Sequence, residues 1–167
     1  GTFDDIDELY NQARGFFVKD NEEEKLLELI RDTGKLEVMG FNETGAAIAA
    51  TFGQEILKSR YARRLTEFVE PLRKAHETGD PTVKISRISS GEQAEQGPRY
   101  QLGIASLDYS GLIAVISGAC FKEGLDARRV YAYTNPKFKV ALDFFEMTSE
   151  KIIEEPGALR KGIEDAI

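Results

Sequence analysis

The residues best suited to chemistry lie together in one segment, residues 107–118. There a β-forming stretch runs into an acidic, glycine-containing turn and then into an apolar helix. Asp108 and Gly111 belong to the turn, and Leu112 begins the apolar stretch. A helix that begins here leaves backbone N–H groups free, and a glycine lets a ligand approach the backbone closely. The segment therefore predicts a site for an anion or for the carboxylate of an amino acid.

Two roles stay open for the acidic residue of this turn. The carboxylate of Asp108 suits the ammonium group of a ligand. It also suits a helix cap, and capping is the favoured role because a helix needs it with or without a ligand. Gly111 likewise either admits a ligand or eases a tight turn. The turn by itself does not decide between binding and structure.

Histidine and cysteine are too scarce for several kinds of catalysis. The chain has one histidine, His76, and one cysteine, Cys120. The chain therefore has too few of these residues for a typical structural zinc site, and it offers little for a histidine-activated nucleophile. We expect His76 to be exposed at a helix end and Cys120 to be a small buried residue. We expect no metal, no cofactor and no catalytic residue.

Composition excludes some partners. The formal net charge is −7 and the sequence pI is about 4.9, which argues against binding to nucleic acid or to an anionic membrane surface. No apolar run reaches the roughly 20 residues of a membrane span, and the N-terminus has no signal-peptide pattern. A single cysteine suits a reducing compartment. We therefore expect a cytoplasmic protein, and the first residue, Gly1, indicates processing.

The first half of the chain has helical periodicity. Apolar spacing predicts helices over residues 2–17, 22–31 and 44–76, with Pro71 kinking or splitting the last one. The tripeptide at residues 79–81, Gly-Asp-Pro, is a clear breaker signal. We therefore expect two parts, a helical N-terminal region at 1–79 and a second domain at 80–167.

The second half changes to a twofold period, which is typical of strands. The predicted strands are 83–88, 100–106, 125–134 and 138–147, and the predicted helices are 111–123 and 156–167. This order predicts an α+β, ferredoxin-like domain with a four-stranded antiparallel sheet and helices on one face. A ferredoxin-like unit needs one more strand after its second helix, and the strand at 83–88 can take that place. The expected sheet order is 83–88, 100–106, 138–147, 125–134.

Three segments in this half resemble ACT domains. Residues 108–119 resemble the signature Asp-x-x-Gly-Leu-Leu-x-x-Ile-x-x-Ala, and residues 124–130 resemble the Gly-Leu-(Asn/Asp)-Ile-x-x-Ala-(Arg/Lys)-Ile start of the family's second strand. Residues 140–145 are similar to the Ala-Leu-Asp-x-Phe segment of ACT domains in nitrogen-sensing uridylyltransferases. The resemblance covers residues 83–147 and implies an ACT-type sheet.

The resemblance also implies a function. ACT domains are small regulatory modules that bind amino acids near the first strand–helix turn, usually between two copies. By position, the implied ligand-binding residues here are Asp108, Tyr109, Ser110, Gly111, Leu112 and Ile113, with Leu107 beside them. Arg128 and Arg129 are expected on opposite faces of their strand, and Arg129 is the candidate to reach a ligand across an interface. Tyr109 and Ser110 replace the Arg-Pro or Lys-Pro often found there, so the ligand stays open.

We therefore expect a non-catalytic, ligand-sensing domain that controls a larger protein. Strand 125–134 would form a sheet edge without proline, which favours a homodimer. One alternative is a dimerisation or scaffold module that binds no ligand. A less favoured alternative is a small ferredoxin-like enzyme, because Asp108 would repel a phosphate and no Cys-x-x-Cys pair is present.

Overall fold

The computed structural model describes residues 43–52, 54–88, 97–150 and 152–167 of the chain. Contacts divide the chain into two compact units, Gly1–Arg73 and Lys74–Ile167. The division falls inside helix α6 (Val69–Thr78), and the predicted boundary at residue 79 follows the end of that helix. The helices predicted at 2–17 and 22–31 lie outside the described residues.

The helix predicted at 44–76, with a kink or split at Pro71, is more broken than predicted. It is broken into α4 (Glu43–Thr51), α5 (Gln54–Lys58), the 3₁₀ helix η1 (Ala62–Phe68) and α6. Ser59 explains one break, because its hydroxyl donates to the Ile56 carbonyl at 2.7 Å and accepts the Tyr61 N–H at 3.1 Å. A serine that bonds nearby backbone groups in this way competes with helical bonding.

Proline explains the second break. Pro71 is the third residue of α6, within the first helical turn, where its missing N–H costs no internal hydrogen bond. The apolar period that predicted a long helix survives the breaks, because Ile48, Ile56 and Leu65 are all buried. The predicted apolar face and the predicted split near Pro71 are thus confirmed, and the continuity predicted before that split is wrong.

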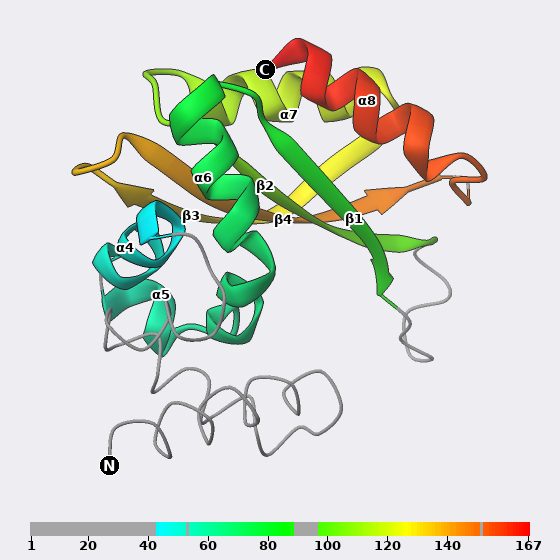
Figure 1. Ribbon diagram of the computed structural model, residues 1–167. Coiled ribbons are helices and arrows are strands. Elements are labelled where there is room, and N and C mark those ends of the chain that lie inside the picture. The colour runs from blue at the N-terminus through cyan, green and yellow to red at the C-terminus, as the bar shows by residue number, and fades with distance from the viewer. Residues whose placement is uncertain (1–42, 53, 89–96, 151) are drawn as a thin grey trace. The chain divides into compact units, whose positions relative to one another are not determined.

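The second unit contains a four-stranded antiparallel sheet (Figure 1). Its elements are β1 (Thr82–Ile88), β2 (Arg99–Leu107), α7 (Leu112–Lys122), β3 (Leu125–Asn135), β4 (Val140–Ser149) and α8 (Pro156–Ala166). The sheet order is β1-β2-β4-β3, which is the order predicted from the strand count. It differs from an ordinary ferredoxin-like sheet, because the strand beside β2 precedes it in the chain.

Strand β4 differs most from the prediction, because it begins and ends two residues later than the predicted strand 138–147. The Asn135 side chain accepts the Phe138 N–H at 3.3 Å, and Lys139 has a φ of 56°. These two features extend the turn between β3 and β4 to residue 139, so β4 begins at Val140 instead of residue 138. An asparagine that bonds a following N–H is a common way to form such a turn.

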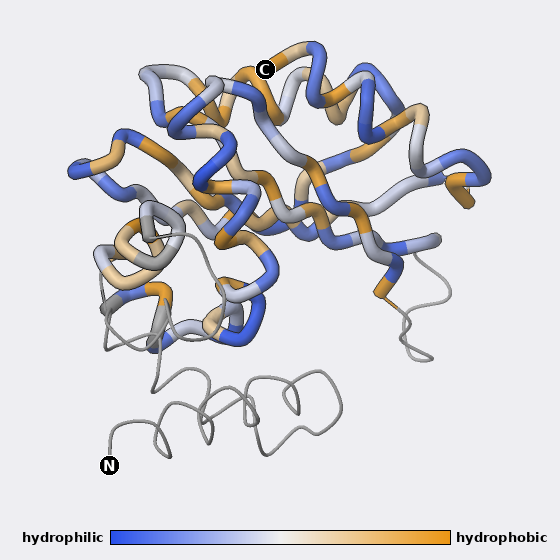
Figure 2. Tube along the Cα trace, in the orientation of Figure 1, coloured by the Kyte–Doolittle hydropathy of each residue, from blue (hydrophilic) through white to orange (hydrophobic). Residues whose placement is uncertain are grey.

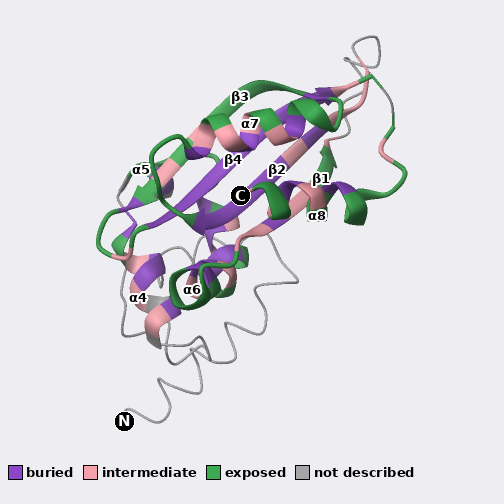
Figure 3. Ribbon diagram, turned by 90° about the horizontal axis from the view of Figure 1, so that it is seen from above, coloured by how far each residue is buried: buried purple, intermediate pink, exposed green. Residues whose placement is uncertain are grey.

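Helices α7 and α8 pack on one face of the sheet, as predicted (Figure 1). Their buried residues alternate with exposed ones, and the alternation along α8 is visible as changes of hydropathy in Figure 2. The core on this face includes Leu102, Phe145, Ile116, Cys120 and Ile163. Figure 3 shows β4 buried along its length between β2 and β3, whereas most of β3 is exposed.

Side chains also tie α8 to the edge of the sheet. The Val83 N–H donates to the Glu164 carboxylate at 2.9 Å, so an edge-strand donor is satisfied by a helix side chain. Within the part of the chain that the structure describes, no helix has the length and apolar character to cross a membrane.

Candidate functional site

The turn between β2 and α7 is fixed at both ends by backbone bonds. The Asp108 N–H donates to the Lys139 carbonyl at 2.9 Å, which ties this turn to the turn between β3 and β4. The Leu112 N–H donates to the Tyr109 carbonyl at 3.2 Å. Residues far apart in the sequence therefore meet at one end of the sheet.

The start of α7 carries no side-chain cap. Its N-cap residue is Gly111, in the left-handed conformation at a φ of 88°, and no side chain bonds the helix start. The capping role favoured for Asp108 is therefore wrong, because the helix begins four residues after it and the glycine occupies the cap position. No described side chain accepts a hydrogen bond from the first N–H groups of α7, which suits an external acceptor.

A cavity of about 160 Å³ lies at this turn, below the first residues of α7. It opens to solvent and is lined by the turn, the start of α7 and residues of β3 and β4. Its lining residues are Asp108, Tyr109, Gly111, Leu112, Ile113, Ala132, Thr134, Ala141 and Asp143. Ala132 and Ala141 are short side chains on the helix-covered face of the sheet, and their size leaves the space open.

Most of the predicted ligand-binding residues line this cavity. Asp108, Tyr109, Gly111, Leu112 and Ile113 do so. Ser110 is exposed in the turn and does not line the cavity. Leu107, expected beside the site, is partly exposed at the end of β2.

Arg129 is not brought to the cavity. A β-bulge between Ala127 and Arg129 changes the alternation of β3. Arg129 pairs in register with Glu146 and approaches its carboxylate at 4.0 Å, on the sheet face opposite α7. The guanidinium is 62% exposed, so its contact with a ligand across an interface stays a prediction.

The bulge also overturns the expectation that the two arginines face opposite ways. The Arg128 Nε donates to the Thr148 hydroxyl at 3.1 Å, and its terminal nitrogen lies 3.7 Å from the Asp126 carboxylate. Thr148 and Glu146 are two residues apart on β4 and share a face. Both arginines therefore reach the same face, because the extra residue of a bulge resets the twofold period.

Asp143 also lines the cavity, and the sequence analysis did not predict it. It lies on the helix-covered face of β4 between Ile104 and Ala132, and only 1% of its surface is exposed. Burial, then the charge of Asp108, raise the pKa of this carboxyl from 3.8 to about 7, while a hydrogen bond from the Tyr133 backbone opposes the rise. The signal was available, because an aspartate inside the apolar run 140–145 is unusual for a buried strand.

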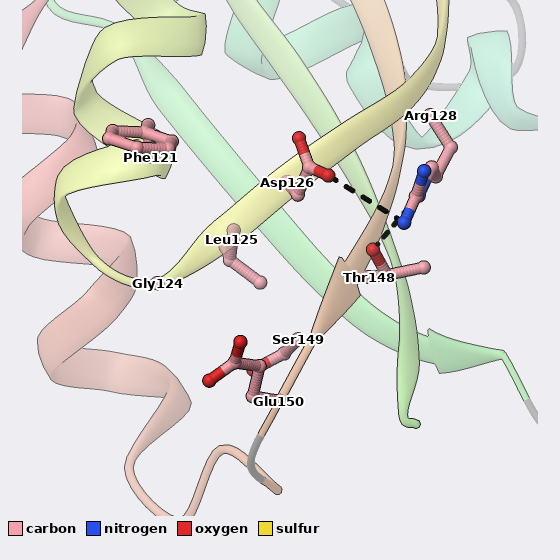
Figure 4. Close-up of a pocket in the computed structure, with 8 residues that line it drawn as sticks. All are labelled: Phe121, Gly124, Leu125, Asp126, Arg128, Thr148, Ser149 and Glu150. Atoms are coloured by element: carbon pink, nitrogen blue, oxygen red, sulfur yellow. Dashed lines mark hydrogen bonds and ion pairs between the residues drawn. The ribbon is translucent and has the colours of Figure 1, made fainter. Parts of the chain in front are cut away.

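A second and larger cavity, of about 490 Å³, lies at the other end of α7 (Figure 4). Its lining includes the side chains of Phe121, Asp126, Arg128 and Glu150. The guanidinium of Arg128 in this cavity already has protein partners, because it contacts both Asp126 and Thr148. No residue of the predicted ligand site lines this cavity.

His76 and Cys120, the two residues considered for catalysis, have contacts that are typical of structural residues. His76 is exposed near the end of α6, as predicted, and its Nδ1 lies 3.0 Å from the Phe138 carbonyl. Cys120 is buried in the core of α7, and burial, then Glu123, raise the pKa of its thiol to about 12. Among the described residues, no three His, Cys, Asp or Glu side chains form a group that could hold a metal ion.

Comparison with known proteins gave no match to a family model, a curated protein or a solved structure. The resemblance to ACT domains therefore rests on the three sequence segments given above. A function for this chain has to be argued from the cavity at the β2–α7 turn and from the chemistry of its lining.

Proposed function

We propose that this chain carries a non-catalytic regulatory domain, ferredoxin-like and of ACT type, that binds an amino acid or a similar small molecule. The ligand site is the cavity at the β2–α7 turn. The observation that carries the proposal is that five of the seven implied ligand-binding residues line this one cavity. The cavity is large enough for a few atoms and is placed at the strand–helix turn that the resemblance implies.

The chemistry of the cavity fits a zwitterion. Its helix start lacks a side-chain cap, which suits a carboxylate. Its two aspartates, Asp108 and Asp143, suit an ammonium group. Leu112 and Ile113 supply apolar walls for a short side chain. An amino acid presents these three kinds of group within a few ångströms.

The sheet order supports the ferredoxin-like assignment. The three strands that follow β1 lie in the order β2-β4-β3, and β1 fills the slot beside β2. In an ordinary ferredoxin-like sheet that slot belongs to the last strand. Such a rearranged order keeps the turn between β2 and α7 at the end of a central strand, where ligands approach.

A thermal-shift screen of the full chain against the common amino acids tests the proposal. Binding to the folded state alone raises stability by about 2.7 kcal/mol when the ligand is present at 100 times its Kd. We expect at least one amino acid to raise Tm in the wild-type chain and to lose its effect in Asp108→Asn. Asp126→Asn, a change at an exposed aspartate on the other face of the sheet, serves as the matched control.

The second candidate function is a dimerisation module. Strand β3 is an edge of the sheet, is eleven residues long and holds no proline within its bounds. Such an edge offers unpaired backbone groups to a second copy. If no amino acid shifts Tm and Asp108→Ala changes stability alone, the dimerisation module becomes the better account.

A further inference from the structure

The floor of the β2–α7 cavity holds a polar atom without a protein partner. The Oδ2 atom of Asp143 is buried and accepts no hydrogen bond from any residue that the structure describes. Only 1% of the surface of Asp143 is exposed. A buried carboxyl oxygen left unbonded is costly, and native proteins satisfy almost all such atoms.

Among the described residues, the lining of this cavity contains a second carboxyl and no lysine or arginine. Along the sheet the neighbours of Asp143 are Ile104 and Ala132, which offer no side-chain donor. The charged group that acts on it is Asp108, whose charge has the same sign and raises its pKa. Tyr109 is the other titratable residue in the lining. Two acidic groups on one small cavity favour a cation between them.

The size of the cavity limits what that cation is. A volume of about 160 Å³ corresponds to about five water molecules at the volume of the liquid. The walls are apolar at Leu112 and Ile113 and short at Ala132 and Ala141. This space admits an ammonium group with a short aliphatic chain.

We propose that Asp143, with Asp108, binds the ammonium group of a small primary amine or a short-chain amino acid in this cavity. The inference rests on the proposed function, since it assigns the cation-binding half of the same site and narrows the ligand class. Asp143 lies on β4, so it contacts the ligand from the sheet, whereas Asp108 contacts it from the turn. Binding converts an unpaired buried carboxyl into a charge-assisted pair.

Three probes separate the parts of this inference, each titrated into the full chain at pH 8 by calorimetry. The probes are alanine, ethylamine, which has the ammonium alone, and propionate, which has the carboxylate alone. We expect alanine and ethylamine to bind, and Asp143→Asn to weaken both by about tenfold or more, the usual loss for a charged hydrogen bond. Asp126→Asn is the control and leaves both affinities unchanged.

The pH dependence of ethylamine affinity is a second test, because a purely structural role of Asp143 would not change it. An ammonium requires the ionised carboxylate, so the affinity of ethylamine for the wild-type chain falls as pH decreases below about 7, the pKa of Asp143. In Asp143→Asn this dependence disappears. If Asp143→Asn does not fold, Ala132→Leu provides a second variant, because it fills the cavity from an exposed strand position and abolishes binding.

The outcomes distinguish the two proposals. If propionate binds and ethylamine does not, with alanine unaffected by Asp143→Asn, the ammonium role of Asp143 is overturned and the proposed function stands. If ethylamine binds and no amino acid does, the inference stands and the proposed function fails. If none of the probes binds the wild-type chain at millimolar concentration, water alone occupies the cavity and both fail.

Discussion

Asp108 and Asp143 line one cavity, although one lies in the turn before α7 and the other on strand β4. Burial, and then the charge of Asp108, raise the pKa of Asp143 to about 7. The protein therefore holds a buried carboxyl that changes charge near neutral pH. Its Oδ2 has no partner among the described residues, so this relationship has consequences for both stability and binding.

The first prediction concerns stability and pH. The pKa of Asp143 is 3.8 when unfolded and about 7 when folded, so the native state binds the extra proton between these values. The protonated Asp143 therefore adds to the free energy of unfolding below pH 3.8. This contribution, on the order of 4 kcal/mol, is lost as the pH rises to about 7. Urea unfolding of wild type and Asp143→Asn across this range measures the difference between them. A difference that does not change with pH contradicts the assigned pKa.

The second prediction concerns the glycine at the start of α7. Gly111 has a φ of 88°, and a Cβ there would meet no atom within 4 Å. Gly111→Ala therefore costs conformational strain alone, about 1 kcal/mol or more. Gly118 is a matched control, because it lies inside α7 in open space, and Gly118→Ala stabilises the helix by about 1 kcal/mol. In denaturant unfolding, we expect Gly111→Ala to lower the free energy of unfolding and Gly118→Ala to raise it. Changes of the same sign would show that the cap geometry is different.

The third prediction concerns the thiol. Cys120 is 1% exposed, and burial, then Glu123, raise its pKa to about 12. A thiol that stays protonated and buried reacts only when the structure opens. Labelling with a disulfide reagent at pH 8 should be slow in buffer and immediate in urea. Fast labelling in buffer would mean that α7 does not pack as described.

The fourth prediction concerns the edge strand. Val130 is 40% exposed on β3, and a lysine there places charge on the edge that a second copy would pair with. Light scattering at a concentration on the order of tens of micromolar should show a dimer for wild type and a monomer for Val130→Lys. Ala114→Lys adds the same charge at an exposed position of α7 and should stay dimeric. A monomeric wild-type chain would refute the dimer.

Much of the fold could be predicted because strand and helix periods are local properties. The four strands and the helices α7 and α8 follow from alternation and from apolar spacing, and the sheet order follows from placing four strands in one layer. The continuity predicted before Pro71 in the helix at 44–76 was wrong because period does not detect side-chain competition such as that of Ser59. Periodicity also does not reveal the β-bulge at Arg128, because a bulge interrupts the alternation without a sequence signal of its own.

The candidate site was predicted only in part, for a related reason. The turn residues are contiguous in sequence, so their types and order could be interpreted together. Asp143 lies far along the chain, and its role depends on burial and on short neighbours such as Ala132. The capping role assigned to Asp108 failed because a glycine at positive φ starts α7 without a side-chain cap. Cavities arise from tertiary packing and leave only weak traces in a single sequence.

The most direct measurement is an NMR titration of the isotope-labelled full chain with alanine, followed at each backbone amide. The account predicts saturable shifts at Gly111, Leu112 and Ile113, and at Asp143, which line one cavity from separate elements. Amides at the opposite end of α7, such as those of Gly124 and Leu125, should stay in place. Shifts confined to that second cavity, or no shifts up to millimolar alanine, would contradict the account.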